Sequence, residues 1–252
     1  MEVREKLFQY LLRLGDNTLI LGQRIAEWCG HGPVLEQDIA LTNIALDLFG
    51  QTRSLLQYAA ELEGKGRTED DLAFLRDVRE FNNCLLVEQP NEDFAYTITR
   101  QFFFDVFHFL LLEGLKESPD TQLAAIAEKS LKEVSYHLRF SSEWMIRLGD
   151  GTDLSRQKIQ EAVNDRWIFT AELYTPDEID REMARLGLAP DLEELKRPYL
   201  EKVKDILEAA TLELPESTFR QLGGKQGRHS EHLGHLLSEM QFLQRAYPGL
   251  TW

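Results

Sequence analysis

The fold class of this chain is decided by residues 7–66, LFQYLLRLGDNTLILGQRIAEWCGHGPVLEQDIALTNIALDLFGQTRSLLQYAAELEGKG. Residues suited to one buried helix face recur there at steps of four and three: Leu7, Leu11, Leu14, Thr18, Leu21, Ile25 and Trp28. This first helix is expected to end at Gly30, Gly32 and Pro33. A second helix is predicted from about Leu35 to Glu63, so the stretch predicts a helical hairpin.

Only eight prolines interrupt 252 residues, so long helices are expected along much of the chain. Two of them form a second predicted hairpin. An irregular connection over about 70–91, with a short helix near 72–78, comes first. A helix over about 92–117 follows it, and after a turn at 118–120 another helix runs to about 148. Two hairpins joined by a long crossover have the connectivity of a ferritin-like four-helix bundle. Shorter helices follow, at about 153–173, 176–187, 191–212 and 228–247.

The sequence therefore predicts an all-α protein with a single ferritin-like domain over residues 1–252. The core bundle is expected in residues 1–150, and residues 151–252 are expected to form a C-terminal helical extension. No strand pattern, low-complexity segment or linker is apparent in the sequence.

Charge and composition exclude several classes of partner. The formal net charge is −15, which disfavours binding to nucleic acid or to an anionic membrane, and leaves a basic protein face as the better match. No uncharged apolar run reaches the roughly 18 residues of a membrane span, and no signal peptide is recognised at the start. The two cysteines, Cys29 and Cys84, form no CxxC pair, which favours a reducing cytoplasm.

Polar residues occur in the two hairpins at about the spacing that a di-iron bundle uses. Such a centre needs about four carboxylates and two histidines, supplied by Glu-x-x-His motifs on the second helix of each pair. Antiparallel helices of this length bring positions about 30 residues apart to the same height. Asn17 with Asp47 and Asp105 with Glu133 match that spacing.

The predicted di-iron set is nevertheless incomplete. Asn17 shares the apolar seam of Leu14 and Leu21, so the first hairpin carries a buried amide there, and Asp16 is expected to lie off that buried face. The histidine positions are occupied by Gly50 and Tyr136. We therefore predict that the chain holds no di-iron centre and has no catalytic residues of its own.

Two interpretations of the second hairpin stay open. One metal could be held by residues that share or adjoin the inward face: Asp105, His108, Glu133 and His137. Alternatively, these residues form a buried polar network that replaces the metal in joining the helices, because buried acids need hydrogen-bond partners.

The C-terminal segment concentrates histidines and basic residues behind two glycines. A zinc site on one helix face could use His229, Glu231, His232 and His235. We favour instead a partner-contact surface formed by basic and histidine side chains: Lys225, Arg228, His229, His232 and His235.

An aromatic run also marks the third predicted helix, at Phe102, Phe103, Phe104, Phe107 and Phe109. Consecutive phenylalanines point all around a helix, so this helix is either central or covered by another subunit.

Five blocks together resemble a known family: 14–62, 85–105, 133–152, 167–174 and 223–249. These blocks resemble the C subunits of bacterial ring-1,2-phenylacetyl-CoA epoxidases, with LGDNTLILGQRIAEWCGHG near the start and GGKQGRHSEHLGHLLSEMQFLQRAYPG at the end as the most specific. The resemblance covers the chain from about residue 10 to its end.

The resemblance implies a ferritin-like, non-catalytic structural subunit of a phenylacetate-degrading monooxygenase complex. It further implies a homologous catalytic A subunit, which holds the di-iron centre and binds the acyl-CoA, and a reductase subunit that supplies electrons from NADPH. Because surface meant for the A subunit would be exposed, the isolated chain is expected to self-associate or to be poorly soluble.

Two other functions remain alternatives at this stage. One is a di-iron oxygenase or ferroxidase that is active by itself with an irregular ligand set. The other is a zinc-dependent hydrolase that uses the C-terminal histidine segment.

Overall fold

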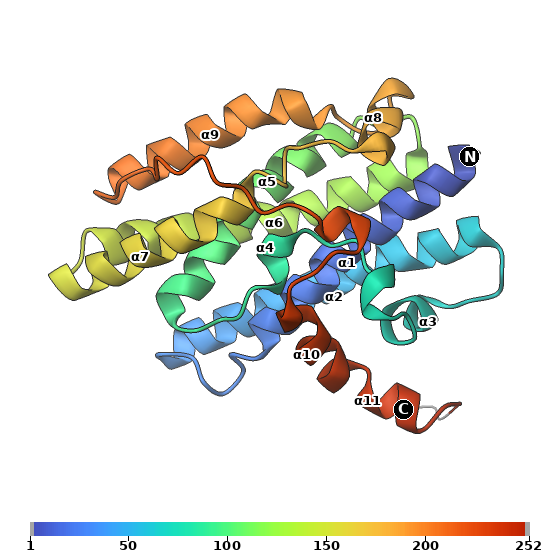
Figure 1. Ribbon diagram of the computed structural model, residues 1–252, viewed down its shortest axis with the longest axis horizontal. Helices are drawn as coiled ribbons and strands as arrows, with labels where there is room; N and C mark the ends of the chain where they lie inside the picture. The colour runs from blue at the N-terminus through green and yellow to red at the C-terminus, as the bar shows by residue number, and fades with distance from the viewer. Residues whose placement is uncertain (1–2, 250–252) are drawn as a thin grey trace. The chain divides into compact units, whose positions relative to one another are not determined.

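A computed structural model describes residues 3–249, and every regular element in that range is helical, with no strand (Figure 1). The all-α prediction is confirmed. Contacts divide the chain into two compact units. The first unit combines Met1–Gln89 with Gly223–Trp252, and the second comprises Pro90–Leu222. The predicted extension over 151–252 is thus shared between the units, and the single domain stays a prediction.

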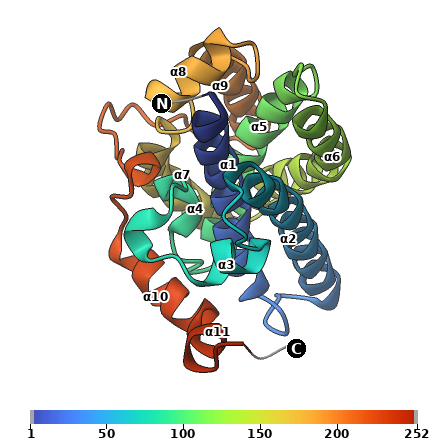
Figure 2. The same cartoon turned by 90° about the vertical axis from the view of Figure 1, so that its right-hand side faces the viewer.

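The first unit is built on the helical hairpin that the opening stretch predicts. Helices α1 (Val3–Ala26) and α2 (Leu35–Glu63) run side by side (Figure 1 and Figure 2). The predicted end of α2 is confirmed, because Gly64 caps it with φ 69° and donates its N–H to the carbonyl of Ala60. The middle of α1 is buried on every side, from Tyr10 to Gly22.

Short helices complete the first unit. They are α3 (Glu69–Phe74), η1 (Val78–Glu80), α4 (Leu85–Glu88), η2 (Gly224–Gln226), α10 (Glu231–Met240) and α11 (Phe242–Ala246). Thr68 begins α3 through a capping box with Asp71, which explains why a helix forms within the irregular connection. The single C-terminal helix predicted over about 228–247 is divided into α10 and α11, because Gln241 closes one and opens the other.

The second unit contains the predicted second hairpin and three further helices. They are α5 (Phe94–Leu115), α6 (Thr121–Gly149), α7 (Asp153–Thr170), α8 (Glu178–Arg185) and α9 (Leu192–Ala209). Asp93 and Asp120 cap α5 and α6 by accepting backbone N–H groups of the first turn.

Helix α5 is the centre of the second unit, since α6, α7 and α9 all pack against it (Figure 1). Phe102, Phe103, Phe104 and Phe107 are buried, and the Phe103 ring lies 5.7 Å from the Trp167 ring of α7. Four residues of the aromatic run therefore form part of the core of the second unit, whereas Phe109 is half-buried.

No helix within residues 3–249 is long and apolar enough to cross a membrane. Cys29 is exposed and Cys84 is buried, and no disulfide joins them.

Candidate functional site

Asn17, the α1 position in the predicted di-iron spacing, is engaged in holding the chain together. The side-chain oxygen of Asn17 accepts the backbone N–H of Cys84 at 2.8 Å. Asn17 is buried, as predicted from its place on the apolar seam. Its amide oxygen fixes the segment that leads into α4.

Asp16 is also buried, contrary to the expectation that it lies off the buried face. It forms an ion pair with Arg76, which is itself buried, and it accepts the backbone N–H of Asn82 at 2.8 Å. The expectation was wrong because neighbouring elements cover α1 on all sides along this stretch, so adjacent residues are both enclosed. The arginine that would have indicated this pairing lies 60 residues away.

On α2 the predicted pair of positions does not face inward. Asp47 is only half-buried, and Gly50 is exposed, with no atom within 4 Å of where a β-carbon would stand. Leu48 and Gln51, each one residue later, are both buried and keep the i, i+3 spacing. The inward-facing pair therefore lies one residue later than the sequence spacing suggests.

The same one-residue shift applies to α6. Tyr136 is 39% exposed and Glu133 is half-buried, whereas Val134 and His137 are fully buried. The inward pair is thus Val134-x-x-His137, with an imidazole at the histidine position and an apolar side chain at the glutamate position. Extending the apolar seam of α6 through Ala127 would have indicated this register.

Five buried polar residues of α5 and α6 form what we call the Asp105 cluster: Gln101, Asp105, His108, His137 and Ser141. One carboxylate oxygen of Asp105 accepts the side-chain amide of Gln101 at 2.7 Å, and the other accepts the Ser141 hydroxyl at 2.8 Å. Both donors are neutral, and the Ser141 bond joins α6 to α5, whereas the Gln101 bond lies within α5.

Burial controls the charge of this cluster. Loss of water raises the pKa of Asp105 to about 7, against the opposing effects of His137 and the two hydrogen bonds. Burial, reinforced by His137, lowers the pKa of His108 to about 3, so its imidazole is neutral at ordinary pH. The His108 ring lies 5.1 Å from that of Phe104, and its Nδ1 atom has no hydrogen-bond partner among residues 3–249.

The residues present do not fit a di-iron centre. The inward positions carry Asn17, Leu48, Gln51 and Val134 where carboxylates or imidazoles are needed. Across the described range, no group of three or more His, Cys, Asp or Glu side chains is arranged to hold a metal ion. The Asp105 cluster instead has the bonding pattern of the buried polar network, one of the two interpretations of the second hairpin.

The C-terminal histidine segment is held by buried hydrogen bonds. His229 lies 2.8 Å from Glu88 through Nδ1 and 2.9 Å from the carbonyl of Phe81 through Nε2. Burial lowers the pKa of His229, but the bond to Glu88, the charges of Glu88 and Asp16 and the bond to the Phe81 carbonyl together raise it overall. Glu88 also accepts the backbone N–H of Ser230 at 2.6 Å. Both ring nitrogens are occupied, so a zinc site that uses His229 is wrong for this fold.

The predicted partner-contact residues are divided by burial. Lys225 is buried, and the side chain of His229 is only 1% exposed, so neither reaches the surface of this chain. Arg228 and His235 are exposed and His232 is half-buried. Partner contact stays a prediction for these three.

Comparison with known proteins places the chain in a family. The model of the family described as "Phenylacetic acid catabolic protein" matches residues 1–252. The C subunit of the 1,2-phenylacetyl-CoA epoxidase of Escherichia coli (strain K12) is 55% identical over 247 residues, which cover 98% of this chain and 99% of that protein. The chain belongs to the phenylacetic acid catabolic protein family.

Proposed function

We propose that this chain is the structural C subunit of a 1,2-phenylacetyl-CoA epoxidase in phenylacetate catabolism, and that it works in the cytoplasm. The observation that carries the proposal is the 55% identity to the Escherichia coli protein over nearly the full length of both chains. At that level of identity a shared role is the simplest expectation.

The chain acts by binding and supporting a homologous catalytic A subunit. The partner holds the di-iron centre, which activates O2 for epoxidation of the aromatic ring, and a reductase subunit supplies electrons. The buried positions of this chain support the proposal that the partner, and not this chain, binds iron. Leu48 and Val134 leave no carboxylate where iron would need one. What this chain contributes is a stable helical surface.

A ferritin-like bundle is the proposed arrangement of the two hairpins. The α1–α2 hairpin belongs to one unit and the α5–α6 hairpin to the other, with a long connection between them. This order of elements is the one that such bundles use.

Reconstitution of the epoxidase tests the proposed function. The catalytic subunit and reductase of the same organism are assayed with phenylacetyl-CoA, O2 and NADPH, with and without this chain, and this chain is also assayed with the reductase alone. We expect epoxide only when the catalytic subunit is present, and faster turnover when this chain is added. Epoxide formed by this chain and the reductase alone would instead indicate a self-sufficient di-iron oxygenase.

A further inference from the structure

Helix α2 presents an apolar surface to solvent. Leu35, Ile39 and Leu46 are 71%, 51% and 61% exposed, although all three are strongly apolar. At 100° per residue they share one side of the helix with Asn43 and Gly50. We call these five residues the α2 stripe. It extends over four turns, which is the pattern of a surface that receives another helix.

Gly50 gives the stripe a point of close approach. It lies well inside α2, where glycine weakens a helix relative to alanine. Within residues 3–249, apart from the adjoining backbone of α2 itself, no atom lies within 4 Å of where a β-carbon would be, so no packing contact there requires glycine. The helix is regular at this point, and Ser54 donates its hydroxyl to the Gly50 carbonyl at 3.1 Å. The open space suits the backbone of a second helix.

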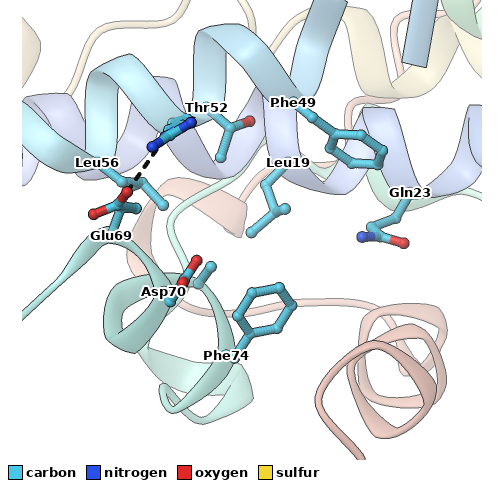
Figure 3. A pocket seen from close by; sticks show the side chains of 10 residues that line it. Leu19, Gln23, Phe49, Thr52, Leu56, Glu69, Asp70 and Phe74 are labelled. Carbon is cyan, nitrogen blue, oxygen red and sulfur yellow. Dashed lines mark ion pairs between the residues drawn. The ribbon is translucent and has the colours of Figure 1, made fainter. Parts of the chain in front are cut away.

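A pocket of about 420 Å³ is lined by residues of α1, α2 and α3, among them Phe49, which precedes Gly50 in the sequence (Figure 3). Phe49 from α2 and Phe74 from α3 lie on opposite sides of it, and Leu19 from α1 contributes to its wall. The apolar walls can take one large aromatic or aliphatic side chain. Arg53 lines the pocket and, at 100° per residue, lies on the same side of α2 as the stripe, so the pocket adjoins the stripe there and offers an anchor point.

The charges around this surface indicate the chemistry of its partner. Glu36 and Asp70 are exposed beside the stripe and at the pocket rim. Arg53 lies 3.4 Å from Glu69 across the rim, which offsets one acid and leaves the rim acidic on balance. The whole chain carries −15, so a second copy would bring like charge, whereas a partner helix flanked by Lys or Arg is complementary.

We propose that the α2 stripe and its pocket are the surface on which the catalytic subunit docks. The occupant is an apolar helix of that subunit, flanked by basic residues, which crosses α2 near Gly50 and places one large side chain between Phe49 and Phe74. This inference rests on the proposed function, because that function supplies the partner.

The test measures the affinity of the full-length chain for the purified catalytic subunit of the same organism. Leu46→Glu places a charge in the stripe, and Gly50→Gln fills the crossing point with a good helix former. Each is expected to raise Kd at least about tenfold. Leu154→Glu is the matched control, because Leu154 is 64% exposed but lies on α7, and its Kd should stay at the wild-type value.

Folding is checked by circular dichroism and thermal unfolding, and Gly50→Gln should melt no lower than the wild type because it removes a helical glycine. Unchanged Kd values for both stripe variants, with tight wild-type binding, would overturn the inference but leave the proposed function intact. Failure of the wild type to bind would overturn the function itself. A wild-type homodimer that Leu46→Glu dissociates would assign the surface to a second copy and overturn the proposed occupant.

Discussion

Asp105 is a buried carboxyl group whose hydrogen bonds come from neutral side chains. Its carboxyl group is fully buried and is held by Gln101 of its own helix and Ser141 of α6. In a metal site a carboxylate is neutralised by the cation, whereas here burial favours the protonated form. The consequence is a pH-dependent contribution to stability.

Asp105→Asn is expected to remove that dependence. Because the folded pKa of about 7 lies above the ordinary value of 3.8, the contribution of Asp105 is full below the lower value and is lost as pH rises to about 7. The unfolding free energy of the variant minus that of the wild type should therefore increase with pH over this range, by at most about 1.4 kcal/mol per pH unit.

Urea unfolding at a series of pH values between about 4 and 8 measures this difference. His137 of α6 and His108 of α5 face the same cluster and are unchanged in both proteins. Asp205→Asn, at an exposed position of α9, serves as the control. Parallel pH profiles for the wild type and Asp105→Asn would contradict the assignment.

Asp16→Ala is expected to be strongly destabilising, because it leaves the Arg76 guanidinium buried without its partner. Breaking a buried pair in this way costs roughly 3–5 kcal/mol. Glu201→Ala, in the exposed Arg197–Glu201 pair, should cost less than about 1 kcal/mol. Equal shifts in the urea midpoints of the two variants would show that the buried Asp16–Arg76 pair contributes no more to stability than the exposed pair.

The residue-scale predictions succeeded where burial follows from the seam and failed where it depends on neighbouring elements. Asn17 lies on the seam of α1, and its burial was predictable. The expected positions on α2 and α6 were displaced by one residue, since a spacing of about 30 cannot distinguish adjacent residues. In the structure, the exposure of Gly50 and Tyr136 shows which side of α2 and of α6 is turned outward.

At the scale of elements, local chemistry determined most helix boundaries. Helix α2 occupies the predicted range from Leu35 to Glu63 because Gly64 provides a left-handed cap. The short helices of the connection and the break between α10 and α11 were harder to foresee. Gln241 at that break donates its side-chain amide to the carbonyls of Ala73 and Arg76, which are distant in sequence.

Two helical glycines are expected to respond in opposite directions to the same substitution. Gly50→Ala should stabilise the isolated chain by about 0.5–1 kcal/mol, since the site is open. Gly149→Ala should destabilise it by roughly 1–3 kcal/mol, because the new methyl group would clash with the backbone oxygen of Ala210. The Gly149 carbonyl also accepts the Thr211 hydroxyl at 3.2 Å, so the two segments cannot separate freely.

Thermal unfolding of both glycine variants measures these effects against the wild type. A loss of stability in Gly50→Ala would mean that this chain itself uses the open space. That outcome would remove the argument for a helix crossing at Gly50.

At the scale of the whole molecule, sequence patterns gave the helical class and the order of the hairpins. They did not give the grouping of the C-terminal helices with the first hairpin. That grouping depends on contacts such as His229 with Glu88, whose partners lie 141 residues apart. No local pattern in either segment specifies such a pairing.

Metal content provides a prediction for the molecule as a whole. The purified chain, produced in iron-supplemented medium, should contain far less than the about two iron atoms per chain of a di-iron protein. The inward positions Leu48 and Val134 supply no ligand. Elemental analysis, with the catalytic subunit as the positive control, makes the measurement, and about two irons per chain would contradict the prediction.

The central claim is that this chain works by binding a homologous catalytic subunit. Sedimentation velocity of the two purified full-length chains, alone and mixed, tests it most directly. We predict that the mixture sediments as a single species heavier than either chain alone. Two independent boundaries, unchanged from those of the separate chains at every concentration, would contradict the account.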